Sequence, residues 1–188
     1  MSKTAIQEKR LTLDEFLSSP LASEKYEYFD GELIQKMSPK RSHSRVTLAL
    51  SSILEDWNQD KGEVGIEWCV RLKRDDKDWC PIPDLLYISY DKLGEIELED
   101  DACPIPPELV IEIISPAQSF SNLSEKAEAY LKAGVSLVWL IDTKVKKITV
   151  FYPDSPPQTK QGEDSLGNDL LPELSLTPLQ IFQKAKLI

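Results

Sequence analysis

The chain of 188 residues lacks any apolar run near the roughly 20 residues that a membrane-spanning helix needs. Its first ten residues, MSKTAIQEKR, also lack the apolar core of a secretory signal. We therefore expect a cytoplasmic protein that does not bind membranes. No internal repeat or low-complexity tract is present, and this length suits one domain with a single core. We expect an N-terminal tail over residues 1–10 and one domain over residues 11–188.

Cysteine is scarce. The three cysteines, Cys69, Cys80 and Cys103, are odd in number and have no CxxC spacing. That pattern argues against a disulfide framework and against a structural zinc site. We expect three reduced, packed thiols.

Positive charge is also in short supply. There are 22 Lys and Arg residues against 32 Asp and Glu residues, which gives a net charge of -10. This balance disfavours a protein that binds nucleic acid through its overall charge. Basic residues do cluster in segments 36–45, 71–77 and 144–147, a pattern more often found on a solvated surface than along a nucleic-acid track.

Three helices are indicated by capping residues and apolar spacing. Segment 11–19 begins with a capping box of Thr12 and Glu15. A long helix with apolar residues at helical spacing should begin at Ser42 or Ser44. A third helix is expected over segment 121–134, with Asn122 as its N-cap. An irregular tail with a last helix should close the chain.

Strands alternate with these helices. Segment 25–37 reads as a hairpin around an Asp-Gly pair, and segment 64–72 as an alternating strand that forms a second hairpin with segment 79–89. Segment 109–114 is almost wholly apolar, as expected for a central strand covered on both faces. Two more strands are expected at 136–142 and 146–152. The pattern predicts a single-domain α/β or α+β fold, with a central sheet flanked by helices.

Two carboxylates stand in apolar surroundings. Asp84 lies between Pro83 and the run LLYIS, and Glu112 lies inside LVIEII. Burial of an unpaired carboxylate costs several kcal/mol, so such positions usually hold a partner or a metal. If the two strands are neighbours, Asp84 and Glu112 can share Mg²⁺, which prefers oxygen ligands. The structural alternatives are a turn cap for Asp84, and for Glu112 a buried Arg or Tyr as partner.

Lys126 is the third notable residue. On a helical wheel it lies at the margin of the apolar stripe that contains Leu123 and Tyr130. From there it can lean over the strand that carries Glu112. The alternative is a surface lysine whose stem packs beside Tyr130.

These segments resemble a known family. Asp84 in PIPD, Glu112 in ELVIEIISP, and Lys126 with Tyr130 in EKAEAYLKAGVSLVWLID are similar to the signature of the Uma two family. These are restriction endonuclease-like proteins of the PD-(D/E)xK nuclease superfamily and are numerous in cyanobacteria. The resemblance extends over most of residues 11–183. It departs at Ile114, where the superfamily usually has its lysine, and so implies that Lys126 supplies the ammonium group from the next helix.

The resemblance implies a restriction endonuclease-like mixed sheet and a Mg²⁺- or Mn²⁺-dependent endonuclease that hydrolyses phosphodiester bonds of DNA. It implies that the metal is held by Asp84, Glu112 and the carbonyl of Ile113. Lys126 would orient the attacking water or neutralise charge on the phosphate. The expected supporting residues are His43, in a loop before the long helix, Glu27, Asp30 and Tyr130. Nucleases of this kind commonly pair their subunits, so a homodimer is also expected.

Two other functions remain open at this stage. A nuclease-like domain without catalysis can act as a binding or assembly module, which the net charge of -10 suits. A metal-dependent hydrolase of another phosphate ester would use the same residues.

Overall fold

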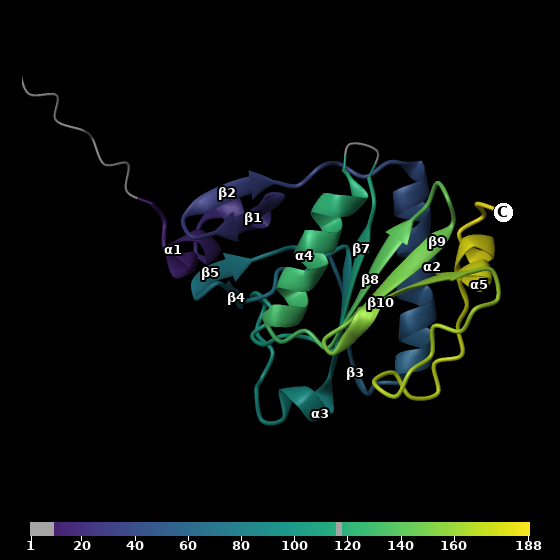
Figure 1. The fold of residues 1–188 in the computed structure, drawn as a ribbon. Helices are drawn as coiled ribbons and strands as arrows, with labels where there is room; N and C mark the ends of the chain where they lie inside the picture. The colour runs from purple at the N-terminus through teal and green to yellow at the C-terminus, as the bar shows by residue number, and fades with distance from the viewer. Residues whose placement is uncertain (1–9, 116–117) are drawn as a thin grey trace, which may run out of the picture.

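The structure, a computed structural model, describes residues 10–115 and 118–188, so the expected tail lies outside it except for Arg10. Two sheets make up the fold (Figure 1). The larger has the strand order β10-β9-β8-β7-β6-β3 and the smaller β2-β1-β5-β4. The strands are β1 (Tyr26–Phe29), β2 (Glu32–Gln35), β3 (Gly62–Ile66), β4 (Leu72–Arg74), β5 (Lys77–Cys80), β6 (Leu85–Ser89), β7 (Leu109–Ile113), β8 (Leu137–Asp142), β9 (Lys147–Tyr152) and β10 (Ser155–Gln161).

The helices differ widely in length. They are α1 (Leu13–Leu17), the 3₁₀ turn η1 (Pro20–Ser23), α2 (Arg41–Asn58), α3 (Tyr90–Leu93), α4 (Phe120–Lys132) and α5 (Pro178–Lys184). Among the described residues, no helix combines the length and the apolar character needed to cross a membrane.

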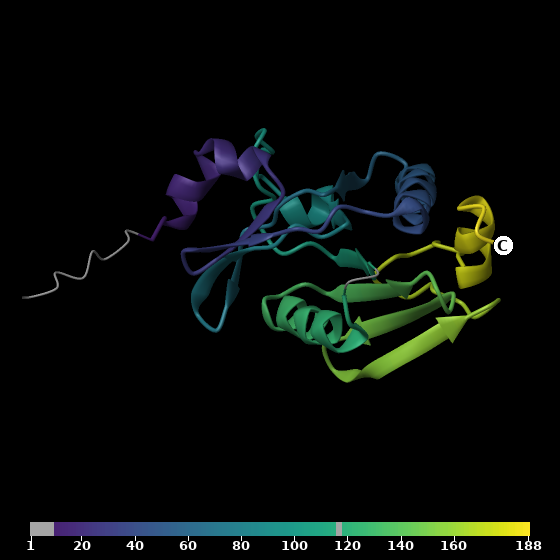
Figure 2. The ribbon, with the colours of Figure 1, turned by 90° about the horizontal axis from the view of Figure 1, so that it is seen from above.

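The six-stranded sheet is mixed and forms the centre of the domain. β7 runs parallel to β8, with α4 as the connection between them, whereas the other neighbouring strands are antiparallel. Side chains on one face of this sheet pack against α2 and α5, and those on the other face pack against α4 (Figure 2). A mixed sheet with helices on both faces confirms the expected fold class.

The smaller sheet extends from one side of the domain and has its own small core of Phe16, Tyr28 and Cys80 (Figure 1). Its first hairpin is the predicted one. Asp30 and Gly31 have φ values of +47° and +83°, the left-handed pair that a tight two-residue hairpin turn requires.

Two predicted helix starts need correction, whereas the capping box of α1 is confirmed. Helix α2 begins at Arg41 and not at Ser42 or Ser44, because Lys40 already has the extended backbone of an N-cap. Helix α4 is capped by Ser119 and not by Asn122. The hydroxyl of Ser119 accepts a hydrogen bond from the backbone N–H of Asn122 at 3.1 Å, which places Asn122 inside the first turn.

The strand predicted over segment 64–72 is divided between the two sheets. It ends as β3 at Ile66, because Glu67 has a φ of +49° and turns the chain toward the smaller sheet, where β4 begins. Strand β10 was not predicted, since its sequence SPPQTKQ contains two prolines. It lies at the edge of the sheet, where a residue without a backbone N–H is tolerated.

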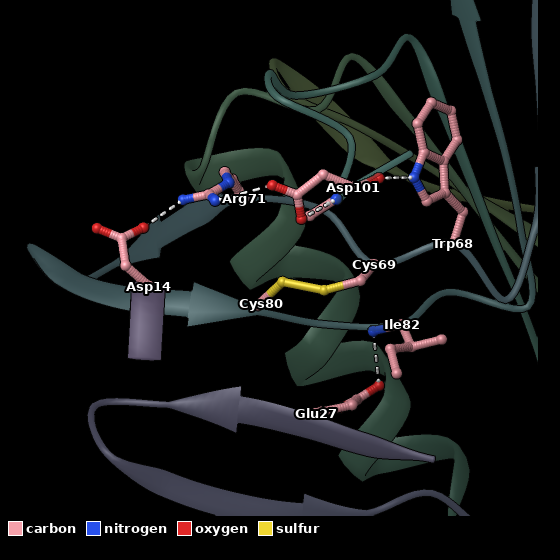
Figure 3. The surroundings of a disulfide bond; sticks show 9 residues. Asp14, Glu27, Trp68, Cys69, Arg71, Cys80, Ile82 and Asp101 are labelled. Carbon is pink, nitrogen blue, oxygen red and sulfur yellow. Dashed lines mark hydrogen bonds and ion pairs between the residues drawn. A yellow bond between two sulfur atoms is a disulfide. The ribbon is translucent and has the colours of Figure 1, made fainter. Parts of the chain in front are cut away.

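The prediction of three reduced thiols is wrong for two of them. Cys69 and Cys80 form a disulfide (Figure 3). Cys103 is a free, buried thiol. The two partners are 11 residues apart in sequence, but the β4–β5 hairpin between them brings their Cα atoms to 5.9 Å. That separation lies within the range that a disulfide spans.

Candidate active site

Asp84 and Glu112 lie side by side at one end of the β6–β7 pair. In the antiparallel register Leu85 is opposite Ile111, so the next pair along is Asp84 and Glu112. The backbone N–H of Asp84 continues the ladder with a hydrogen bond of 3.1 Å to the carbonyl of Ile111. Both side chains are almost fully buried, with exposed fractions of 2% and 3%. The two carboxylates are therefore neighbours in the fold, as predicted.

The carboxylate of Glu112 has two partners on α4. Its Oε1 accepts a hydrogen bond from the Tyr130 hydroxyl at 2.9 Å and lies 2.9 Å from the Lys126 ammonium group. Among the residues that the structure describes, Oε2 accepts no hydrogen bond. Burial raises the pKa of Glu112, and the neighbouring charge of Asp84 raises it further, against the opposing effect of Lys126.

Lys126 lies between two carboxylates. Besides Glu112 it contacts Glu27 of β1, whose Oε1 is 2.6 Å from Nζ. Burial would lower the pKa of Lys126, but the charges of Glu112 and Glu27 outweigh it and raise this pKa. Glu27 in turn accepts a hydrogen bond of 3.2 Å from the backbone N–H of Ile82 (Figure 3). The ammonium group is thus held as a cation in a fixed place.

The carboxylate of Asp84 has three partners. Its Oδ2 accepts a hydrogen bond from the backbone N–H of Ile113 at 2.7 Å and lies 2.9 Å from Nε2 of His43. Its Oδ1 lies 2.7 Å from Nζ of Lys36. Burial opposes ionisation, yet the hydrogen bond from His43 and the charge of Lys36 lower the pKa of Asp84 from its usual 3.8 to about 2. Asp84 is therefore a carboxylate throughout the physiological range.

These groups share one cavity of about 400 Å³ between α4, the first hairpin and the β6–β7 end. Of the predicted residues, five line it, namely Glu27, His43, Asp84, Glu112 and Lys126. Tyr130 reaches the site from the core through its hydroxyl group. The carbonyl of Ile113 as a metal ligand stays a prediction.

Two of the supporting predictions are wrong in position. His43 belongs to the first turn of α2 and not to a preceding loop, because that helix begins at Arg41. Asp30 does not line the cavity. It lies in the hairpin turn, where its carboxylate is 2.7 Å from Nζ of Lys77 and 3.9 Å from a guanidinium nitrogen of Arg10.

Lys36 is a site residue that the sequence reasoning missed. It was counted only as part of a basic cluster. In the hairpin register Glu27 is opposite Ile34, and side chains two residues apart on a strand share a face. Lys36 therefore lies on the face that carries Glu27. Because Glu27 was expected in the pocket wall, the alternation of side chains along the hairpin strands could also have predicted Lys36 there.

The donor groups of this site suit Mg²⁺ by their chemistry. Asp84 and Glu112 offer hard carboxylate oxygens, and Mg²⁺ is usually held in proteins by only one or two carboxylates and by water. Oδ1 of Asp84 is buried and, among the described residues, faces only the ammonium group of Lys36, with no backbone N–H as partner. In the described part of the chain, however, no three His, Cys, Asp or Glu side chains form a ready metal cluster. Any ion would depend on this pair of carboxylates.

Comparison with known proteins supports a nuclease fold. The family model Uma2, described as "Putative restriction endonuclease", matches residues 13–179. Among solved structures, a "putative nuclease belonging to DUF820" from Anabaena variabilis is 25% identical. The match covers 93% of this chain and 99% of that one, with a TM-score of 0.77. No curated protein matches the chain.

Proposed function

Since this chain belongs to the Uma2 family, whose model matches residues 13–179, we propose that it is a divalent-metal-dependent endonuclease that hydrolyses phosphodiester bonds of DNA. The observation that carries the proposal is the convergence of two buried carboxylates and one partly buried lysine in a single cavity. Asp84 and Glu112 come from adjacent strands, and Nζ of Lys126 lies 2.9 Å from Glu112. Buried charges that share a cavity, with shifted pKa values, are typical of active sites.

Asp84 and Glu112 are the proposed holders of the metal, with Mg²⁺ or Mn²⁺ as the ion. The lowered pKa of Asp84 keeps one full negative charge in the site at neutral pH. When bound there, the ion would supply polarisation of the phosphate and a water molecule of lowered pKa. Oε2 of Glu112 accepts no hydrogen bond from a described residue, which leaves one oxygen of this carboxylate for a ligand.

Lys126 is the proposed catalytic cation. Its position between Glu27 and Glu112 keeps it protonated and restricts its movement, so no reorganisation is needed when negative charge develops on a phosphate. Glu27 acts as a positioning residue through this contact. His43 positions Asp84 in the same way, since it lies 2.9 Å from Oδ2. Tyr130 fixes the rotamer of Glu112 by its hydrogen bond.

The lining of the cavity suits a DNA backbone. Arg74, Gln118 and Asn122 line it beside the charged cluster and offer the donors that usually contact phosphate and sugar oxygens. Arg74 also lies over the ring of Phe29, with 5.5 Å between the guanidinium carbon and the ring centroid, which places a positive charge at the cavity. A homodimer and a cytoplasmic location stay predictions.

The proposal is tested by incubating the purified protein with supercoiled plasmid, single-stranded DNA and RNA, each with Mg²⁺, with Mn²⁺ or with EDTA. We expect metal-dependent cleavage of DNA that is lost in Asp84→Asn, Glu112→Gln and Lys126→Ala. The matched controls are Lys132→Ala and Glu128→Gln, which remove the same charges from exposed positions of α4 and should leave cleavage unchanged.

Two results would contradict the proposal in different ways. Cleavage that persists in Lys126→Ala would exclude this lysine from the chemistry. A folded protein that cleaves none of the three nucleic acids with either metal would instead favour the non-catalytic module, or a hydrolase of a different phosphate ester.

A further inference from the structure

We propose that Lys36 is an internal counter-ion of the site. Its ammonium group pairs with the carboxylate of Asp84 and moves toward the carboxylate of Glu67 when a divalent cation binds Asp84. The inference rests on the proposed metal site, and it adds a control on metal loading that is built from the chain's own residues.

Lys36 and Asp84 form a short, largely buried ion pair. Nζ lies 2.7 Å from Oδ1, and the two side chains are only 12% and 3% exposed. The contact joins two opposite charges at hydrogen-bonding distance. A divalent cation at Oδ1 would compete with the ammonium group for the same negative charge.

Oδ1 is also the oxygen of Asp84 that has no backbone partner within residues 10–115 and 118–188. Oδ2 already accepts the backbone N–H of Ile113 and lies beside Nε2 of His43. The N–H of Ile113 is part of β7 and cannot turn away without disturbing the central strand. A cation held by Asp84 and Glu112 would therefore compete at Oδ1 with the ammonium group of Lys36.

Glu67 offers Lys36 a second position. Its Oε1 lies 3.7 Å from Nζ of Lys36, so a shift of about 1 Å would bring the pair to the distance of a charge-assisted hydrogen bond. Glu67 is one-third exposed and lies toward the outside of the cluster, where it also pairs with Lys25 at 3.0 Å. Lys36 follows the end of β2, and its backbone lies outside any helix or strand.

The experiment is a calorimetric titration with Mn²⁺ alone, in the absence of nucleic acid, at pH 7.5 and low salt. The variants are Lys36→Met, Glu67→Gln, the double variant and Lys25→Met. Lys25→Met is the matched control, because it removes the same charge beside Glu67 but does not touch Asp84. Circular dichroism confirms the fold of each. If Lys36→Met does not fold, Glu67→Gln carries the test, since Glu67 is on the surface.

We expect Lys36→Met to bind Mn²⁺ at least about tenfold more tightly than the wild type, because a competing unit charge is removed from Oδ1. Lys25→Met should change the affinity by less than about twofold, as expected for a screened surface charge. Glu67→Gln should weaken binding, because Lys36 then has no second partner. This effect should shrink in the Lys36→Met background.

Different results would contradict the role of Lys36 and the metal site itself. Equal Mn²⁺ affinity in the wild type, Lys36→Met and Lys25→Met would overturn the role of Lys36 and leave the proposed nuclease intact. So would a Glu67→Gln effect that is the same with and without Lys36. Absence of Mn²⁺ binding in every variant would overturn the metal site itself, and the inference about Lys36 with it.

Discussion

The charge of Asp84 should stabilise the folded protein at neutral pH and cease to do so in acid. Its pKa is lowered from 3.8 to about 2 in the folded state, so its contribution is present above pH 3.8 and is lost as the pH falls through 2. The difference of nearly two units corresponds to about 2 kcal/mol of unfolding free energy, since each unit is worth about 1.4 kcal/mol. Asp84→Asn cannot titrate and should lack this loss.

The assay is urea denaturation of the wild type and Asp84→Asn at steps between pH 6 and pH 2. We expect the wild type to be the more stable at pH 6 and its advantage to shrink by about 2 kcal/mol by pH 2. Asp154→Asn, an exchange at an exposed position, serves as the control and should run parallel to the wild type. If the Asp84→Asn curve is parallel to the wild type as well, then Asp84 is not held as a carboxylate by Lys36 and His43, and the electrostatic account of the site is wrong.

Two further predictions concern the groups around the site. Tyr130→Phe removes the hydrogen bond to a buried carboxylate and should lower the free energy of unfolding by about 2 kcal/mol in urea at pH 7, and an unchanged value would mean that the bond is not formed. Reduction of the disulfide between Cys69 and Cys80 with a phosphine should lower the free energy of unfolding by about 3 kcal/mol, given the loop of 11 residues that it closes. The same reductant should have no effect on Cys69→Ser. If the phosphine does not change the free energy of unfolding of the wild type, the two thiols are not joined.

Sequence patterns identified the carboxylate pair because its members contradict their surroundings. An acidic residue inside LVIEII conflicts with local hydrophobic patterning, and Glu112 indeed points into the cavity and not into a dry core. The helical wheel predicted that Lys126 leans over the strand that carries Glu112, and the two side chains are in contact. This prediction was possible because residues along a helix keep fixed angles to one another. The outline of the fold followed from periodicity, and the structure confirms it.

Other features depended on contacts between distant segments. Lys36 meets Asp84 only because the first hairpin folds over the β6–β7 end, which local pattern does not determine. The pairing of Cys69 and Cys80 did not follow from the predicted hairpin of segments 64–72 and 79–89, because with Leu72 opposite Trp79 the next residue in register with Cys80 is Arg71. Strand β10 was missed because an edge position tolerates prolines that an interior strand would exclude.

The central claim is that Asp84 and Glu112 together hold a divalent cation beside Lys126. The most direct test is a crystal of the protein soaked in Mn²⁺, with diffraction data collected at the manganese absorption edge. The account predicts one anomalous peak between the two carboxylates, within reach of the Lys126 ammonium group, and no such peak in Asp84→Asn. Manganese bound only elsewhere on the protein, with Lys36 and Lys126 still in place on the two carboxylates, would contradict it.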